Sequence, residues 1–386
     1  MSKKTGCLIL QEIIYLDNAS TTKPSEGVKR AVLEAMESFG NPSSMHRMGL
    51  AAEKIVKKSR EQVAAVLGVE PGKVYFTSGG TEANNTAIFG AANSRRGKHV
   101  VTTQIEHPSV LAPFRALAEQ GFAVTYLKPD KDGRIDLDAF SAALREDTVL
   151  ASVMQVNNEV GTVQPVDKLK SLMQEKCPYA LLHVDAVQGF GKTEIKPRQW
   201  GVDLVSVSAH KIHGLKGSGA LYIGNGRIAP LISGGGQEKD LRSGTENVPG
   251  IAGFGAAAAE LVNRNENTKA LRLYLQEQLI KKIPDIKING SGEHQSGYVL
   301  NVSFRGIKAE ILLHMLEEQG IFVSTGSACS TNKPMPSHVL TAMGCTPEEV
   351  AGAVRFSFCG TESQEMLDKA ADVTAEKVAE IRKYMR

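Results

Sequence analysis

The chain has 386 residues and a formal net charge of +3, from 45 lysines and arginines against 42 aspartates and glutamates. Such an even balance argues against nucleic acid or a membrane surface as the main ligand. Hydrophobic residues make up 42% and charged residues 23%, as in ordinary globular chains, and no apolar run approaches the roughly 20 residues that a membrane span needs. Composition therefore excludes disordered, collagenous and membrane-spanning proteins.

The cysteines indicate the compartment. There are five of them: Cys7, Cys177, Cys329, Cys345 and Cys359. An odd number, wide spacing and no C-x-x-C pair predict neither a disulfide framework nor a structural zinc site. The apolar stretch 7–10 is too short for the core of a signal peptide. We therefore expect a reducing cytoplasm, and the length suggests two domains.

The first elements in chain order are helical. Segments 25–39 and 50–67 have apolar residues at helical spacing. The first segment carries one apolar face, formed by Val28, Val32, Met36 and Phe39.

From residue 74 onwards, short β-branched and apolar runs alternate with helical segments. Seven runs have the pattern of strands: 74–77, 99–103, 123–127, 149–156, 180–184, 204–208 and 220–224. Several are apolar throughout, as strands buried on both faces should be. Helical segments lie at 81–92, 108–119 and 165–175. The alternation predicts an α/β fold whose large domain has a mostly parallel, seven-stranded sheet flanked by helices.

The pattern changes after residue 248. A long helical pattern over 248–283 precedes a helix at 308–318 and strands at 298–304, 321–323 and 353–358. These elements predict a smaller α+β domain. We expect a large domain over 16–262, and a small domain formed by 1–15 together with 263–386.

Polar side chains follow the apolar runs, where the carboxyl ends of parallel strands bind ligands. Ser78-Gly79-Gly80-Thr81 opens a helix whose free amides can hold a phosphate. The later runs are followed by Glu106, His107, Asn157, Asn158, Glu159, Asp185, Gln188, Ser208, His210 and Lys211. Taken singly, such features are more often a tight turn, a structural histidine or a helix cap.

Lys211 is the most informative of these residues. A lysine directly after a buried strand loses hydration, which lowers its pKa and favours the neutral amine that attacks a carbonyl carbon. Such an amine, a phosphate cradle and a carboxylate suited to a pyridinium nitrogen form the protein's side of pyridoxal phosphate chemistry. The combination predicts pyridoxal 5'-phosphate as the cofactor.

Two other chemistries compete for this region. Residues 186–193, A-V-Q-G-F-G-K-T, fit a relaxed phosphate loop in which Lys192 and Thr193 would serve a nucleotide hydrolase. Ala186 replaces the first glycine of that loop and no helical pattern follows, so this stays a remote alternative. His210 and His213 lack a third nearby metal ligand, so no metal site is expected.

Cys329 is the second reactive centre. It lies within 324–336, S-T-G-S-A-C-S-T-N-K-P-M-P, where small residues, glycine and proline predict an exposed, mobile loop. We interpret the other four cysteines as structural thiols. An exposed thiolate suits a nucleophile, and Lys333 is close enough in sequence to lower the thiol pKa.

Ten short motifs occur in order along the chain. They are Y-L-D-N-A (15–19), G-N-P-S-S-M-H (40–46), T-S-G-G-T-E (77–82), E-H (106–107), V-N-N-E-V-G (156–161), H-V-D-A-V-Q (183–188), S-A-H-K (208–211), R-S-G-T-E-N (242–247), G-S-A-C (326–329) and V-R-F-S (354–357). Together they resemble the cysteine desulfurases, members of the class V aminotransferase family with the type I pyridoxal phosphate fold. The resemblance covers nearly the whole chain.

The resemblance implies roles for the matching residues. It implies that Lys211 bonds to the cofactor, that Asp185 pairs with the ring nitrogen, and that Gln188 forms a hydrogen bond to the ring hydroxyl. It implies that His107 stacks on the ring and moves protons, and that Asn158 adds a further contact. The implied phosphate cradle is formed by Gly80, Thr81, Ser208 and His210. It also implies a homodimer in which Thr245 completes the cradle across the interface. The implied contacts of the substrate carboxylate are Asn41, Asn158 and Arg355.

The resemblance implies a reaction as well. L-cysteine would become L-alanine, and Cys329 would take its sulfur as a persulfide for a protein acceptor in iron–sulfur cluster assembly or in tRNA or cofactor thiolation. A selenocysteine lyase or an aminotransferase of the same fold is the alternative, and Cys329 discriminates between them. The chain departs from the common family pattern by Ser20 in place of alanine, and by His213 and Leu215 in place of tyrosine and proline.

Overall fold

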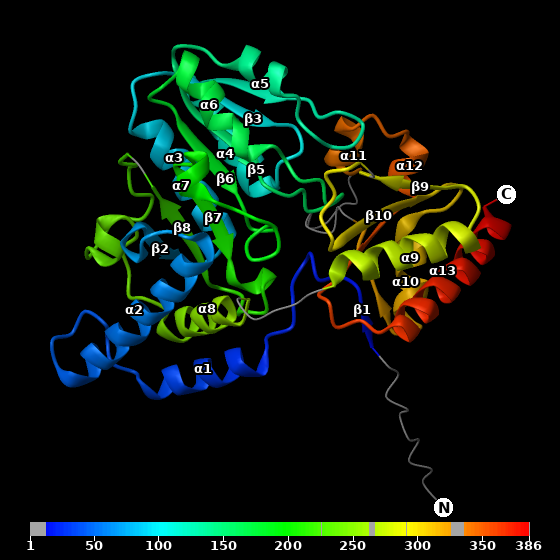
Figure 1. Cartoon of the computed structure of the whole chain (residues 1–386), viewed down its shortest axis with the longest axis horizontal. Coiled ribbons are helices and arrows are strands. Elements are labelled where there is room, and N and C mark those ends of the chain that lie inside the picture. The colour runs from blue at the N-terminus through cyan, green and yellow to red at the C-terminus, as the bar shows by residue number, and fades with distance from the viewer. Residues whose placement is uncertain (1–12, 225, 262–266, 291, 326–335, 386) are drawn as a thin grey trace, which may run out of the picture.

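The computed structural model describes residues 13–224, 226–261, 267–290, 292–325 and 336–385. A large sheet and a small sheet organise these residues, and they lie side by side in Figure 1. The small sheet belongs to the C-terminal part of the chain, drawn yellow to red.

The large sheet has seven strands in the order β2-β8-β7-β6-β5-β3-β4. Pairs from β7 through β6, β5 and β3 to β4 are parallel, whereas β8 runs antiparallel to β2 and β7. The strands are β2 Val74–Thr77, β3 His99–Thr103, β4 Ala123–Leu127, β5 Thr148–Met154, β6 Leu181–Asp185, β7 Leu204–Ser208 and β8 Gly219–Ile223. The predicted mostly parallel, seven-stranded sheet is confirmed.

Helices cover both faces of this sheet, and every residue of its central strands β5, β6 and β7 is buried. Leu150 and Leu181 pack with α3 and α4 on one face, while Ala151 and Leu182 pack with α2, α6 and α8 on the other. The helices of this part are α1 Glu26–Glu37, α2 Arg47–Leu67, α3 Gly80–Asn93, α4 Pro108–Glu119, α5 Leu137–Ala143, α6 Val166–Lys176, α7 Pro197–Trp200 and α8 Val248–Leu261.

The small part has an antiparallel sheet in the order β12-β10-β9 and a hydrophobic core of its own. β1 pairs in parallel with β11, which ties the N-terminal segment to this part. Its elements are β1 Ile14–Tyr15, α9 Thr268–Lys282, β9 Ile286–Asn289, β10 Val299–Phe304, α10 Ala309–Glu317, β11 Ile321–Phe322, α11 His338–Ala342, α12 Pro347–Ala351, β12 Ala353–Ser357 and α13 Gln364–Tyr384. A domain boundary near residue 262 stays a prediction.

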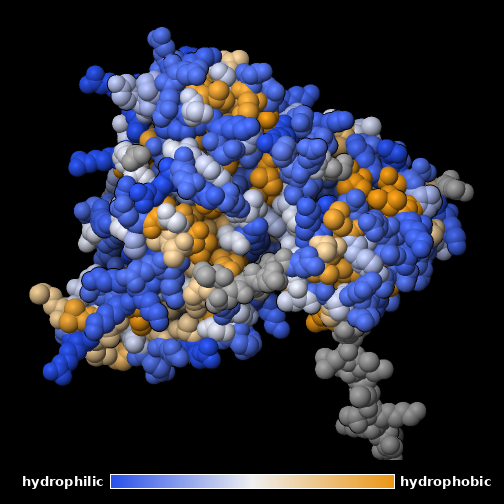
Figure 2. Space-filling model, viewed as in Figure 1, coloured by the Kyte–Doolittle hydropathy of each residue, from blue (hydrophilic) through white to orange (hydrophobic). Residues whose placement is uncertain are grey.

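One expectation about the helices is wrong. The pattern over 248–283 forms two helices, α8 and α9, instead of one. The apolar face of α1 is only partly buried: Val28 is buried, but Met36 and Phe39 are 58% and 79% exposed. α1 packs mainly on α8, and several of its other apolar side chains are exposed. Figure 2 shows apolar residues gathered where α1 meets α2, at the lower left.

No helix in the described ranges is long and apolar enough to cross a membrane. Cys177, Cys345 and Cys359 are free thiols. Cys7 and Cys329 lie outside the described residues.

Candidate active site

A cavity of about 200 Å³ opens at the carboxyl ends of β3, β5, β6 and β7, beside the start of α3. This is the edge at which open parallel sheets bind ligands. The lining residues are Ala19, Ser20, Gly80, Thr81, Asn84, His107, Ser109, Met154, Val156, Asn158, Asp185, Val187, Gln188, Ser208, His210, Lys211 and Arg355. The cavity thus brings together ten of the residues singled out from the sequence.

Asp185 is the last residue of β6 and is 5% exposed. Its Oδ1 accepts a hydrogen bond from the backbone amide of Val187 at 2.9 Å. Its Oδ2 accepts one from Nδ2 of Asn84 at 2.8 Å. Both oxygens are therefore held in place, which fixes the direction in which the carboxylate presents its charge.

His107 is the N-cap of α4, and this position settles its tautomer. The backbone amide of Ser109 donates to Nδ1 of His107 at 3.1 Å, so Nδ1 carries no proton and the neutral ring carries it on Nε2. Burial lowers the pKa of His107, against the opposing effect of Asp185. The imidazole is therefore neutral at pH 7, with one N–H to offer.

Asn84 and Ser109 connect Asp185 with His107, and neither was singled out from the sequence. Nδ2 of Asn84 also donates to Oγ of Ser109 at 2.9 Å, and that oxygen lies 2.7 Å from Nδ1 of His107. Asn84 lies one helical turn after Thr81, so the spacing places both residues on the inward face of α3. This spacing could have identified Asn84 from the sequence, but not the residues to which it is hydrogen bonded.

Lys211 and His210 form a short 3-10 turn, Ala209–Lys211, directly after β7. Nζ of Lys211 donates to the carbonyl oxygens of Ala19 at 2.6 Å and Ser20 at 2.8 Å. Burial lowers the pKa of His210 to about 4, helped by the charge of Lys211, so His210 is neutral at pH 7.

Arg355 reaches the cavity from β12, in the small part. It is 3% exposed, its Nη1 donates to the carbonyl of Asn158 at 2.8 Å, and its Nη2 donates to Oδ1 of Asp17 at 2.7 Å. Its Nε has no hydrogen-bond partner among the described residues. A buried guanidinium with an unused N–H suits a carboxylate ligand.

Other polar atoms around the cavity also lack partners within the described ranges. They are Oδ1 of Asn84, Oε1 of Gln188 and Oγ of Ser208. Buried polar atoms are nearly always hydrogen bonded, so this set indicates a polar ligand. At Gly80, the first residue of α3, a Cβ would come 2.7 Å from Cγ2 of Val187, so glycine keeps the helix N-terminus open to an anion.

Glu106 lies behind the cavity and is fully buried. Its Oε1 accepts hydrogen bonds from Oγ1 of Thr103 at 2.7 Å and the amide of Met154 at 3.0 Å, while its Oε2 has no partner among the described residues. Burial raises the pKa of Glu106 to about 8, and the charge of Asp185 adds to the effect. Glu106 is therefore protonated at neutral pH.

Two residues whose roles the resemblance implies, Asn41 and Thr245, do not line the cavity. Asn41 is exposed between α1 and α2, where its Oδ1 accepts from the amide of Ser43 at 2.9 Å. Thr245 is exposed in the connection before α8. Cys329 lies outside the described residues, so its role stays a prediction from the sequence.

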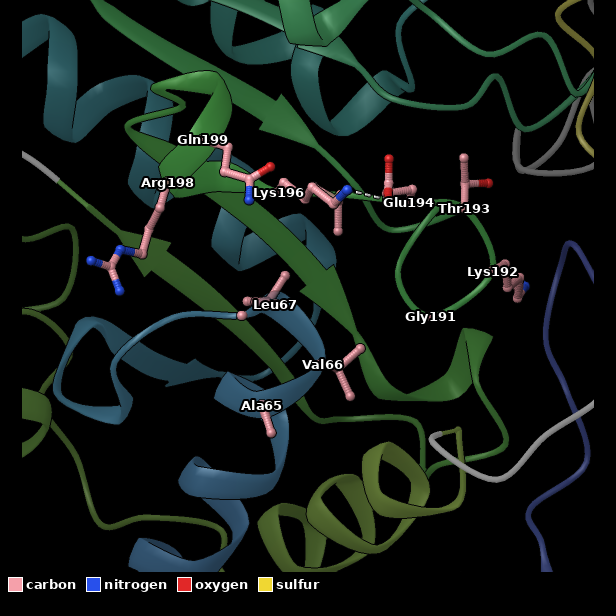
Figure 3. Close-up of a pocket in the computed structure, with 12 residues that line it drawn as sticks. Ala65, Val66, Leu67, Gly191, Lys192, Thr193, Glu194, Lys196, Arg198 and Gln199 are labelled. Atoms are coloured by element: carbon pink, nitrogen blue, oxygen red, sulfur yellow. Dashed lines mark ion pairs between the residues drawn. The ribbon is translucent and has the colours of Figure 1, made fainter.

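The phosphate-loop alternative is wrong. Lys192 and Thr193 line a separate open groove of about 940 Å³ beside the end of α2 (Figure 3). The next helix, α7, begins only at Pro197 and has four residues. A phosphate loop needs a helix that begins directly after its glycines, whereas residues 192–196 separate Gly191 from α7.

Comparisons with known proteins agree with this site. Residues 14–369 match the family aminotransferase class-V. The cysteine desulfurase of Nostoc sp. (strain PCC 7120 / SAG 25.82 / UTEX 2576) is 42% identical over 377 residues, 96% of this chain and 94% of that protein. Cysteine desulfurase IscS of Methanosarcina thermophila is 42% identical over 376 residues, 96% of this chain and 93% of that protein.

Solved structures give the same result. A NifS-like protein superposes with a TM-score of 0.88 at 38% identity, covering 97% of this chain and 100% of that one. SspA in complex with cysteine superposes with a TM-score of 0.81 at 34% identity, covering 91% of this chain and 100% of that one.

The chain belongs to the class V aminotransferase family. Within it, the chain belongs to the cysteine desulfurases, because these relatives match it over nearly its whole length. This membership implies pyridoxal phosphate, in agreement with the amine, the carboxylate and the helix N-terminus that share the cavity.

Proposed function

We propose that this chain transfers the sulfur of L-cysteine to Cys329, giving L-alanine and a Cys329 persulfide. The C–S bond of the substrate breaks, a new S–S bond forms on Cys329, and the substrate carbon gains a proton, so atoms and electrons balance without an external oxidant. The persulfide would then pass to a protein acceptor for iron–sulfur cluster assembly or for tRNA or cofactor thiolation. The observation that carries the proposal is that an amine, Lys211, and a buried guanidinium, Arg355, line one cavity.

The cavity residues fit pyridoxal phosphate. Asp185 would hold the ring nitrogen, Gln188 the ring hydroxyl, and Lys211 the aldehyde carbon. The phosphate would lie on Gly80, Thr81, Ser208 and His210, and Asn158 would complete the contacts. When bound, the cofactor supplies a carbon that bonds to amines and a ring that accepts the electron pair of a broken bond.

Proton movement falls to two groups of this chain. Nζ of Lys211 would take the proton from the substrate's α-carbon, since it lies at the end of β7 inside the cavity. His107 would offer the proton on Nε2, because Nδ1 is occupied by the amide of Ser109. A neutral imidazole can both donate and accept, which the lowered pKa of His107 favours.

The small part of the chain would recognise the substrate's carboxylate. Arg355 brings its unpartnered Nε to the cavity, and the carbonyl of Asn158 holds its Nη1. Asn41 does not line this cavity, so a role for it in carboxylate binding would require approach from a second subunit.

We further propose a homodimer in which Thr245 contributes to the phosphate site across the interface. Thr245 is exposed in a connection that is anchored by an ion pair, 2.9 Å long, between Arg242 and Glu82. Leu33, Met36, Phe39 and Met45 are 64%, 58%, 79% and 94% exposed and form an apolar patch at the α1–α2 corner. A patch of this kind suits a protein–protein interface.

The proposed reaction also defines the partners of the chain and the compartment in which it would work. The substrate is an amino acid and the acceptor a protein, and the near-neutral charge of +3 supports no direct binding of nucleic acid or membrane. A reducing cytoplasm would keep the Cys329 thiol available.

The test is to incubate the purified holoenzyme with L-cysteine and to measure alanine and a persulfide on Cys329 by mass spectrometry. Cys329→Ala should abolish both products, while Cys345→Ala, which removes another thiol of the small part, should change neither. Alanine formed by Cys329→Ala at the wild-type rate would refute persulfide catalysis on Cys329 and favour a lyase, whereas a wild type that forms a 2-oxo acid instead of alanine would favour an aminotransferase.

A further inference from the structure

We propose that Ser20 is a positioning residue for carboxylate recognition: together with Asp17, its hydroxyl fixes the guanidinium of Arg355 in the orientation that receives an amino acid's carboxylate. The inference rests on the proposed function for the identity of the ligand. Its geometry depends on described residues alone.

Ser20, Asp17 and Arg355 form a closed triangle of hydrogen bonds. Nη2 of Arg355 donates to Oδ1 of Asp17 at 2.7 Å and to Oγ of Ser20 at 2.6 Å. Oγ of Ser20 donates to the same Oδ1 at 2.8 Å. Both hydrogens of Nη2 are used, and the hydroxyl makes one bond as a donor and one as an acceptor. The guanidinium therefore cannot rotate without breaking charge-assisted hydrogen bonds.

The rest of the guanidinium shows which edge is left for a ligand. Nη1 is held by the carbonyl of Asn158 at 2.8 Å, whereas Nε has no partner among the described residues. Arg355 is 3% exposed and lines the cavity. A ligand carboxylate thus meets a donor whose direction is already fixed, which reduces the entropy lost on binding.

Ser20 also touches the other group that handles an amino acid. Its backbone carbonyl accepts from Nζ of Lys211 at 2.8 Å, and Ser20 itself lines the cavity. One residue therefore contacts both the amine and the guanidinium. Because the contact to Lys211 uses the backbone, replacing the side chain alone separates carboxylate positioning from the chemistry at Lys211.

Ser20→Ala tests the hydroxyl. Alanine, which the family commonly has at this position, would leave Nη2 paired with Asp17 alone. Removing a hydrogen bond to a charged group weakens binding by roughly tenfold. We expect KM for L-cysteine and Kd for L-alanine, measured by calorimetry on the holoenzyme, to rise by about fivefold to tenfold, with kcat within about twofold of wild type.

Matched controls distinguish positioning from general damage. Ser20→Thr keeps the hydroxyl and should restore both constants to within about twofold of wild type. L-alaninamide lacks the carboxylate charge, so its affinity should be the same in Ser20→Ala and wild type. Ser20→Gly also removes the hydroxyl and should give the same rise in KM for L-cysteine and in Kd for L-alanine as Ser20→Ala. Having two such variants keeps the test informative if one of them folds poorly.

Two results would overturn the proposal: an unchanged Kd for L-alanine in both Ser20→Ala and Ser20→Gly, or an equal loss of affinity for L-alanine and L-alaninamide. Failure of the proposed function is distinguishable. If the wild type forms no alanine from cysteine, sulfur transfer is wrong, while the equilibrium binding of L-alanine still decides the role of Ser20.

Discussion

Nδ2 of Asn84 donates a hydrogen bond to Oδ2 of Asp185 at 2.8 Å, and the same nitrogen donates to Oγ of Ser109 at 2.9 Å. Ser109 in turn holds Nδ1 of His107 through its amide and its hydroxyl. One buried amide on α3 therefore orients both the carboxylate proposed to face the ring nitrogen and the imidazole proposed to move protons. The orientation of the charged and proton-carrying groups at this site therefore depends on Asn84, a residue that neither ionises nor transfers protons.

Asn84→Ala should weaken both groups together. The change leaves Oδ2 of Asp185 and Oγ of Ser109 without a donor in a buried region, which costs about 1–3 kcal/mol of unfolding free energy. We also expect kcat to fall by roughly tenfold, because the acid and the base lose their orientation. Denaturant unfolding and steady-state kinetics measure the two effects.

Asn85→Ala is the matched control for that substitution. Nδ2 of Asn85 donates to the carbonyls of Thr81 at 2.9 Å and Ser109 at 3.3 Å, so it belongs to the same helix but does not contact Asp185. Its effect on kcat should stay within about threefold. Equal losses in the two variants would show that α3, and not the Asn84–Asp185 contact, is the sensitive element.

The sequence was sufficient for the strands but not for this network. A strand that is buried on both faces, such as β7, is made of aliphatic and small residues only (L-V-S-V-S), so local pattern defines its ends. Which polar atoms meet across α3, α4 and β6 depends on how those elements rotate against each other. For the same reason, the periodicity of α1 predicted an apolar face but not that Phe39 would project outwards.

Glu106→Gln should change the pH dependence of stability. Burial raises the pKa of Glu106 from 4.5 to about 8, so the folded state holds a proton that the unfolded state releases between these values. The stability contribution is fully present below pH 4.5, and it is lost as pH rises to 8. Relative to the variant, the wild type should lose on the order of 3–5 kcal/mol of unfolding free energy across that window.

The measurement is denaturant unfolding of both proteins at intervals from pH 5 to 9. Subtracting the Glu106→Gln curve removes the titration of every other carboxylate. The difference should fall with pH and become flat above about 8. A difference that is independent of pH would mean that Glu106 is already ionised in the fold.

Glu238→Ala should destabilise the edge of the large sheet. Glu238 accepts hydrogen bonds from Nη1 and Nη2 of Arg60 at 2.6 and 2.7 Å and from the amide of Phe76 at 2.9 Å, on the outer strand β2. Removing the carboxylate leaves a strand amide unpaired and a mostly buried guanidinium without its counter-charge, bonded to the carbonyl of Val74, which costs about 3 kcal/mol. Lys239→Ala, at an exposed neighbour with a similar positive φ of 56°, should cost less than about 1 kcal/mol.

Thermal or denaturant unfolding compares these two variants. Combining Arg60→Ala with Glu238→Ala should cost less than the sum of the single changes, because the double variant leaves no unpaired charge. Additive losses would indicate that the two side chains act independently.

Phe39→Asp should weaken the proposed homodimer. Phe39 is 79% exposed, far more than an aromatic side chain that packs within its own subunit, and it belongs to the apolar patch at the α1–α2 corner. A charge placed at the centre of an apolar interface removes an aromatic anchor, so the dimer Kd should rise by at least about tenfold in sedimentation equilibrium. Tyr179→Asp supplies the control, because Tyr179 is an equally exposed aromatic at 88% but lies between α6 and β6. If the dimer dissociates in the Tyr179 variant and not in the Phe39 variant, the interface does not include α1. In that case there is also no reason to expect Thr245 to act across the interface.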